Sequence, residues 1–144
     1  MQVRHILREK GSEIVTISAE ATLSEASRLL ARKRIGAVIV RGEAGGLAGI
    51  LSERDVVRAV AEESVGALAR PVHVYMTCDV ATCCEDDSVD ALMEMMTRGR
   101  FRHVPVARDG SLVGIVSIGD VVKSRIEETV REAAALREYI SAAG

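Results

Sequence analysis

The sequence is poor in aromatic residues, which make up 2% of its 144 residues, with no tryptophan and a single phenylalanine, Phe101. A core built by this chain therefore has to consist of Val, Ile, Leu, Ala and Met, and a hydrophobic content of 48% is ample for a compact body. The shortage of aromatic side chains also removes the stacking surfaces on which nucleic-acid-binding proteins rely.

An excess of charge of one sign is missing too. Lys and Arg number 19 against 21 Asp and Glu, so no bulk positive field attracts nucleic acid or anionic lipid. The basic clusters at 32–34 and 98–102 are too small to change this, and we expect no nucleic-acid partner. No stretch approaches the ~18 apolar residues of a membrane span, and the charged start MQVRHILREKGSE does not resemble a signal peptide. We therefore expect a cytoplasmic protein that does not associate with membranes.

Cysteine is scarce, and its pattern supports neither a disulfide framework nor a metal site. The three cysteines, Cys78, Cys83 and Cys84, are odd in number and, together with His73, match no compact zinc spacing. Cys83 and Cys84 would point to opposite faces of an extended segment. Ser52 and Ser117 have no His and Asp partners at a spacing typical of nucleophilic catalysis. We predict no metal, no required cofactor and no enzymatic activity.

What the sequence does contain is one unit present twice. Residues 14–40 align with residues 80–106 at an offset of 66, so that Thr16 falls on Thr82. A turn that is one residue longer in the first copy (RGEAGGLA against ARDGSLV) reduces the offset to 65. The motif GILSERD, which ends at Asp55, then falls on GIVSIGD, which ends at Asp120. Self-similarity of this kind indicates a duplicated structural unit.

Each copy predicts the order β-α-β-β-α. A short strand (14–17; 80–83) precedes a helix, which in the first copy starts with a capping box from Thr22 to Glu25. Two strands joined by a Gly or Asp-Gly turn follow, and a last helix opens at Glu53 or Gly119. One copy is too small to be stable alone, so we expect the copies to pack face to face. The predicted divisions are 1–79 (a helical lead, a first repeat with its core at 14–60, and a connection), 80–126 (a second repeat) and 127–144 (a helical tail).

The repeated Gly-x-x-Ser-x-x-Asp has two explanations. Ser52 followed by Asp55 is close to a capping box, and a duplication copies such a feature as faithfully as it copies a site. Alternatively, a strand that feeds a helix leaves unpaired N–H groups that suit a phosphate. An aspartate on the first helical turn can then accept hydrogen bonds from two vicinal sugar hydroxyls.

These motifs, with GAVIV (36–40), VYMT (74–77) and RHVPV (102–106), resemble a tandem pair of cystathionine-β-synthase (CBS) domains, or Bateman module, of the stand-alone bacterial kind. The resemblance covers residues 3–126 and implies an α/β (α+β) fold of two repeats packed pseudo-symmetrically. It also implies a homodimer, a regulatory role in signal transduction with a protein target that is unknown, and a ribose held by the motif aspartates in a cleft between the repeats. AMP is the expected ligand, with ADP and ATP next. NAD(H), S-adenosylmethionine and a ligand-free dimerisation scaffold stay as alternatives.

Carried over by position, the resemblance implies two unequal sites. The stronger site would combine a ribose side (Asp120, Ser117, Ile118), a phosphate side (Arg102, His103) and an adenine side from the first repeat (Val15, Thr16, Ile35, Gly36, Ala37). Arginine suits the phosphate because its planar group binds it bidentately. The weaker site would use Asp55, Ser52, Arg54, Val80, Thr82 and Phe101, with Gly36 and Ala37 where the stronger site has Arg102 and His103.

Overall fold

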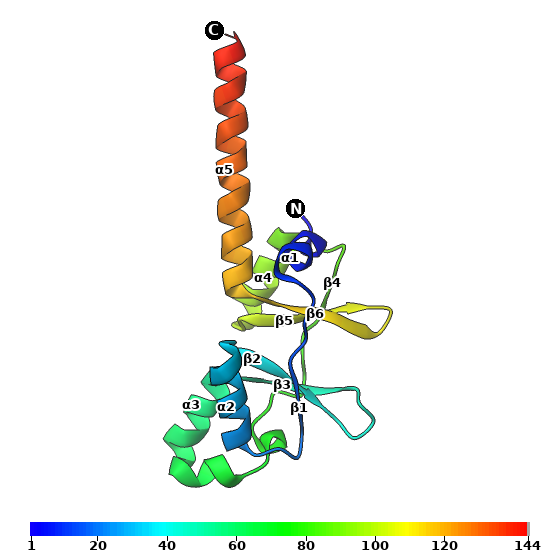
Figure 1. Cartoon of the computed structure of the whole chain (residues 1–144), viewed down its shortest axis with the longest axis vertical. Helices are drawn as coiled ribbons and strands as arrows, with labels where there is room; N and C mark the ends of the chain where they lie inside the picture. Colours follow the sequence, from blue (N-terminus) through cyan, green and yellow to red (C-terminus); the bar gives the residue numbers. More distant parts are fainter. Residues whose placement is uncertain (144) are drawn as a thin grey trace. The chain divides into compact units, whose positions relative to one another are not determined.

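A computed structural model describes residues 1–143 of the chain as a mixed α/β fold (Figure 1). Its elements are, in order, α1 (Val3–Lys10), β1 (Thr16–Ser18), α2 (Leu23–Lys33), β2 (Ala37–Arg41), β3 (Leu47–Ser52), α3 (Glu53–Glu63), η1 (Ser64–Ala69), η2 (Val72–Val74), β4 (Cys83–Cys84), α4 (Val89–Gly99), β5 (His103–Arg108), β6 (Ser111–Ser117) and α5 (Ile118–Ala143). They separate into two compact units. Residues 13–82 form the first-repeat unit, and residues 1–12 with the chain from Cys83 onward form the second-repeat unit.

Each unit contains one three-stranded sheet, in the order β1-β2-β3 or β4-β5-β6. In both sheets the first strand runs parallel to the second, and the second and third form an antiparallel hairpin. The hairpins carry equivalent register shifts, after Val40 in one and after Val106 in the other. The predicted β-α-β-β-α order is therefore confirmed in both copies.

The element boundaries follow local chemistry closely at the helices and less closely at the strands. Thr22 caps α2 by accepting a hydrogen bond from the Glu25 amide at 3.1 Å, as the capping box predicts. The first strand of each sheet is shorter and begins later than predicted, at Thr16 and at Cys83, so Val80 and Thr82 lie outside β4. The periodicity of an apolar run marks its strand character but not where a parallel neighbour begins to pair with it.

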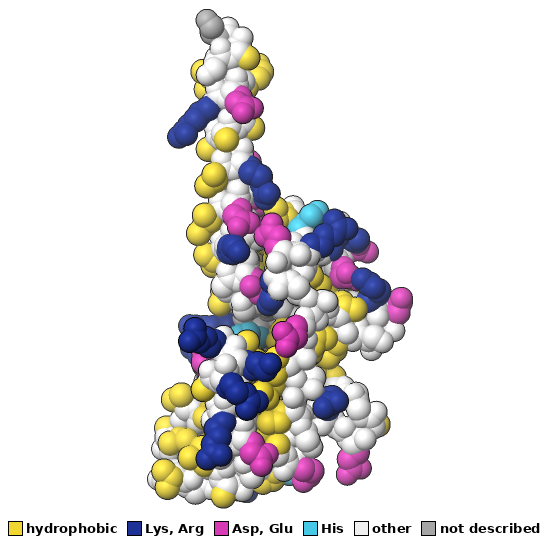
Figure 2. Space-filling view, viewed as in Figure 1, with side chains coloured by type: hydrophobic (Ala, Val, Ile, Leu, Met, Phe, Trp, Pro, Cys, Tyr) yellow, Lys and Arg dark blue, Asp and Glu magenta, His cyan; other side chains and the backbone are white. Residues whose placement is uncertain are grey.

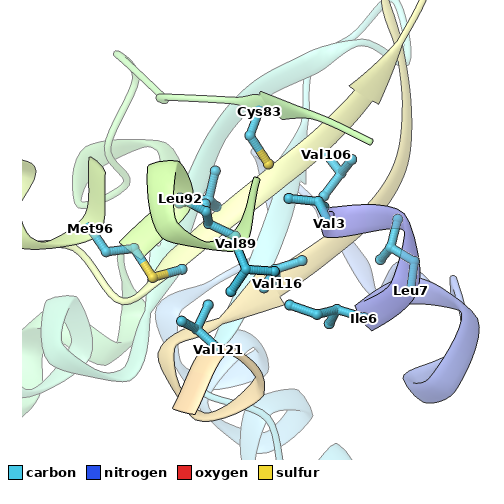
Figure 3. Close-up of a cluster of buried hydrophobic side chains, with 11 residues drawn as sticks. Val3, Ile6, Leu7, Cys83, Val89, Leu92, Met96, Val106, Val116 and Val121 are labelled. Atoms are coloured by element: carbon cyan, nitrogen blue, oxygen red, sulfur yellow. The ribbon is translucent and has the colours of Figure 1, made fainter. Parts of the chain in front are cut away.

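The cores are aliphatic, as the composition predicts. Figure 3 shows the core of the second-repeat unit, where side chains from the sheet, α1, α4 and α5 meet. Its fully buried members include Val3, Val89, Leu92, Val104, Val106 and Val116. Cys83 is buried in the same cluster while Cys84 is exposed, so the two side chains do point to opposite faces. Burial raises the pKa of the Cys83 thiol to about 12 and keeps it protonated at neutral pH. Among residues 1–143, no helix combines the length and apolar character that crossing a membrane requires.

The segment that precedes each repeat packs on the other repeat. In the second-repeat unit the Val3 amide donates to the Asp87 carbonyl (2.9 Å), and the Val89 amide donates to the Met1 carbonyl (2.9 Å). In the first-repeat unit, likewise, the Leu23 amide donates to the Arg70 carbonyl at 2.9 Å. The sequence grouped the helical lead with the first repeat, whereas the structure places residues 1–12 with the second. Helical periodicity identifies an amphipathic helix but not the surface that its apolar face covers.

The motif glycines, Gly49 and Gly114, lie where these crossing segments touch the sheets. A Cβ at Gly49 would lie 2.6 Å from the Thr77 carbonyl oxygen and 2.8 Å from the Met76 sulfur. A Cβ at Gly114 would lie 2.6 Å from Cδ2 of Leu7. Both glycines are therefore required by close approach, but the obstacle is backbone in one case and the end of a flexible side chain in the other.

We predict that Gly49→Ala destabilises the protein more than Gly114→Ala does. Since the Thr77 carbonyl cannot rotate away as the Leu7 methyl can, Gly49→Ala should cost about 1–3 kcal/mol, as overpacking of a filled site typically does. Urea unfolding followed by circular dichroism measures the difference. Gly46→Ala is the control, because no described atom outside the adjoining residues lies within 4 Å of a Cβ there. Equal losses of stability at Gly49 and Gly114 would contradict the conclusion that a rigid backbone group blocks a side chain at Gly49 and a movable one at Gly114.

Candidate functional site

The repeated motif forms a strand-to-helix junction in each unit, and in each junction the serine and aspartate cap the helix reciprocally. At the start of α5, the Ser117 amide donates to Oδ2 of Asp120 at 2.8 Å, and the Asp120 amide donates to Oγ of Ser117 at 3.2 Å. At the start of α3, the same two bonds join Ser52 and Asp55 at 2.9 and 3.3 Å. The capping explanation is thus correct for both copies. It does not exclude a site, because the cap also holds a carboxylate fixed at a helix N-terminus.

The Asp120 carboxylate has a second partner that the sequence did not suggest. Lys10, the last residue of α1, places Nζ 2.7 Å from Oδ2 of Asp120 and 2.8 Å from the carbonyl oxygen of Ile115. Burial by itself raises the pKa of Asp120, but hydrogen bonds from Lys10 and from the Ser117 amide outweigh it, and the pKa lies below its ordinary value. Asp120 is therefore ionised at neutral pH. Its side chain is 22% exposed, so a ligand hydroxyl can still reach it.

The corresponding aspartate of the first-repeat unit has a different neighbour. Oδ1 of Asp55 lies 3.6 Å from Nη1 of Arg58, one turn further along α3, and the Asp55 side chain is 12% exposed. Leu7 and Met76 are equivalent because each touches the motif glycine of its unit. Lys10 ends the helix α1, whereas the described segment after Met76 forms no helix, and the charged partner of Asp55 comes from α3 itself. The two junctions therefore differ in the charged group that contacts the aspartate.

Arg102 and His103 lie beside the Asp120 junction within the second-repeat unit. The Ile118 amide donates to the Arg102 carbonyl at 2.8 Å, and His103 is the strand partner of Ser117. Arg102 is exposed and His103 is half-buried. The structure thus brings together Asp120, Ser117, Ile118, Arg102 and His103, all five residues that the sequence assigned to the ribose and phosphate sides.

The first-repeat unit repeats this arrangement without the basic residues. The Glu53 amide donates to the Gly36 carbonyl at 2.9 Å, and Ala37 is the strand partner of Ser52. Gly36 and Ala37 therefore occupy the positions of Arg102 and His103, as the alignment predicts. Arg54 is exposed on the first turn of α3.

The remaining predicted site residues each contact other residues of the unit to which they belong. Val15 and Thr16 lie along β2, where the Val15 carbonyl accepts from the Ile39 amide at 3.2 Å and Thr16 pairs with Ile39. Ile35 is half-buried before β2, and Phe101 packs against the core of the second-repeat unit. The prediction that each site takes residues from both repeats stays a prediction.

The described residues give less support to a metal site or to ligand contacts from Arg98 and Arg100. Among residues 1–143, no cluster of three or more His, Cys, Asp or Glu side chains is arranged to hold a metal ion. Arg98 hydrogen-bonds to Glu94 on the exposed face of α4, and Arg100 ends that helix in a left-handed conformation. Both belong to a solvated helix end.

Sequence and structure comparisons agree with this architecture. The CBS domain family matches residues 3–62 and 70–127. The crystal structure of the CBS-domain protein ATU1752 from Agrobacterium tumefaciens superposes with a TM-score of 0.84 at 46% identity, over 86% of this chain and 92% of that one. The CBS domain pair of protein MJ0100, in complex with 5′-methylthioadenosine and S-adenosyl-L-methionine, gives 0.78 at 26% identity, over 89% and 98%.

Protein PAE2072 from Pyrobaculum aerophilum, a CBS domain protein complexed with AMP, gives a TM-score of 0.74 at 29% identity, over 83% of this chain and 89% of that one. Two matched segments, two equivalent sheets and two reciprocal Ser–Asp caps identify the same unit in both halves. The chain belongs to the CBS-domain family, as a tandem pair of CBS domains.

Proposed function

We propose that this protein is a non-catalytic regulatory module that senses adenosine nucleotides, with AMP as its principal ligand and the Asp120 junction as its principal site. The observation that carries the proposal is that one fixed carboxylate, bonded to Lys10, lies at the N-terminus of α5 beside two further basic residues, Arg102 and His103. The carboxylate suits a ribose, and the helix terminus and basic groups suit a phosphate. The AMP complex of PAE2072 supports the same ligand class.

Charge separates AMP from the other candidates. S-adenosylmethionine, bound by MJ0100, carries a sulfonium cation that Lys10 and Arg102 would repel, so it ranks second. NAD(H) shares the adenosine end of AMP but needs room beyond the phosphate. Hydrolysis of a nucleotide is not part of the proposal, since the junction offers capping and charge but no activated nucleophile. The module is proposed to act as a homodimer on a protein target.

We predict that AMP raises the melting temperature of the purified protein. A ligand at 100 times its dissociation constant stabilises the folded state by ~2.7 kcal/mol, which corresponds to roughly 5–10 °C for a chain of this size. ADP and ATP should act similarly, and GMP should act less because the residues assigned to the base, such as Val15 and Ile35, are mostly apolar and suit adenine. Differential scanning fluorimetry with each nucleotide checks this. A flat profile across adenosine ligands at millimolar concentration favours a ligand-free scaffold.

We predict that Asp120→Asn and Asp55→Asn differ in their effect on AMP affinity. Both variants lose a similar capping interaction, about 1 kcal/mol or less. Only Asp120 has Lys10, Arg102 and His103 nearby, so Asp120→Asn should also lose a charged ribose contact worth about 1.5–3 kcal/mol, or roughly ten- to a hundredfold in affinity. Isothermal titration calorimetry compares the variants, and urea unfolding serves as the control for capping. Equal losses of AMP affinity in the two variants would contradict the proposal that the two sites are unequal. No loss in either variant would mean that both motifs serve only as helix caps.

We predict that Lys10→Met separates adenosine from AMP. Because Nζ of Lys10 holds the Asp120 carboxylate, its removal should free that group for the ribose and tighten adenosine binding by roughly three- to tenfold. The gain should be smaller for AMP, which loses a cation near its phosphate, so the preference for AMP over adenosine should fall. Calorimetric titration with both ligands measures the two affinities. Lys33→Met, at an exposed lysine 3.9 Å from Glu13, is the control. Weaker adenosine binding in Lys10→Met would mean that Lys10 supports the ribose site rather than competing for it.

A further inference from the structure

The C-terminal helix α5 extends well beyond the surface on which it packs. Val121 and Ser124 are buried near its start, and Nη1 of Arg125 lies 3.2 Å from a carboxylate oxygen of Asp90 on α4. Every described residue from Thr129 to Ala143 is exposed, and Figure 1 shows this part of α5 projecting past α1 and α4. An isolated helix of ~12–15 residues is marginally stable in water, so this projection lacks the tertiary packing that normally stabilises a helix.

The exposed part of α5 carries a regular apolar seam. Its members recur at alternating intervals of four and three residues: Val122, Ile126, Thr129, Ala133, Leu136 and Ile140. Alternating intervals of this kind are the a and d positions of a coiled coil, which repeat every 3.5 residues on average. The large apolar members are 49–61% exposed, and Val130 and Tyr139 flank the seam at 62% and 73%. In Figure 2, hydrophobic side chains are exposed along the whole length of the projecting helix.

The seam lies opposite the side by which α5 packs on its own unit. At 100° per residue, the buried position Val121 is turned about 100° from the middle of the seam, and the buried position Ser124 about 160°. A shallow hollow beside α1 continues that packed side along Glu128, Arg131 and Ala135, with Glu132 at its edge nearest the seam. The second-repeat unit therefore leaves the seam open to another helix.

The charged residues next to the seam favour a second copy of α5 as the partner and favour a parallel orientation of the two helices. Glu132 occupies a g position and Arg137 the following e position, five residues on. In a parallel, in-register pair of α5 helices, Glu132 of each copy faces Arg137 of the other, which gives two opposite-charge pairs. In an antiparallel pair aligned on the same seam, Glu132 would face Glu132, and Lys123 would face Arg137. Like charges at those positions destabilise the pair.

We propose that α5 pairs with α5 of a second copy of this chain as a parallel, two-stranded coiled coil over residues 122–140. The proposal goes beyond nucleotide sensing and does not depend on it. Thr129 and Ala133 make the middle of the seam weak, so the pairing is reversible and tunable rather than permanent. As a consequence, two copies of the module are joined through α5, the helix that begins at the Asp120 cap.

Sedimentation equilibrium of the full chain tests the seam itself. The wild-type protein should be a dimer, and Leu136→Asp should weaken dimerisation by at least about a hundredfold because it places a charge at a d position. Ala134→Asp, an equally exposed change off the seam, should leave the dimer intact. A wild-type chain that stays monomeric at about 100 µM, or a dimer that Leu136→Asp leaves unchanged, would falsify the proposal.

A charge exchange tests the direction. Glu132→Arg should weaken the dimer by roughly tenfold, and the double variant Glu132→Arg/Arg137→Glu should restore it, since the pairs then form with their signs reversed. Glu138→Arg, away from the seam, is the control for net charge. Leu136→Cys in a Cys78→Ser/Cys84→Ser background should form a disulfide-linked dimer on mild oxidation, because identical d positions meet only in the parallel arrangement. Failure of both the rescue and the crosslink, with dimerisation still sensitive to Leu136→Asp, would show that the helices pair antiparallel.

Discussion

The reciprocal hydrogen bonds between Ser117 and Asp120 are the constraint on which the candidate site depends. They end β6, start α5 and hold the aspartate carboxylate at a single place on the first helical turn. The hairpin register then brings His103 and the Arg102 carbonyl beside that turn, and α1 brings Lys10. The side chain that caps the helix is also the one proposed to bind a ribose, so structural and functional explanations of the motif are compatible.

Much of the fold could be predicted from the sequence because its information is local and repeated. The Thr22 capping box, the hairpin turns and the constant offset each depend on neighbouring residues, and the structure confirms them. The alignment also set Arg102 and His103 opposite Gly36 and Ala37, and the strand register agrees, because equivalent residues take equivalent positions in the two hairpins. Lys10 was missed for the opposite reason. It lies 110 residues from Asp120, in a segment that the repeat alignment did not include, and a lone lysine at a helix end gives no signal of its partner.

The two junctions illustrate how a duplication diverges without loss of fold. Both keep the glycine, because a crossing segment touches the sheet there, and both keep the Ser–Asp pair, because the helix needs its cap. The residues around them are free to change. One junction has Lys10, Arg102 and His103, and the other has Gly36 and Ala37 in the positions of Arg102 and His103. The two units thus share one frame, and the surrounding charges distinguish them.

The exchange of leading segments also constrains how the chain is made. The first-repeat unit is continuous from residue 13 to residue 82, so it can complete its sheet and core while the ribosome is still translating the rest. The second-repeat unit is not continuous, because Val3, Ile6 and Leu7 belong to a core whose other members come after residue 82. The amphipathic helix α1, translated before the first-repeat unit, must therefore wait with its apolar face uncovered until the chain beyond residue 82 has been made. During that interval its apolar face is open to a chaperone.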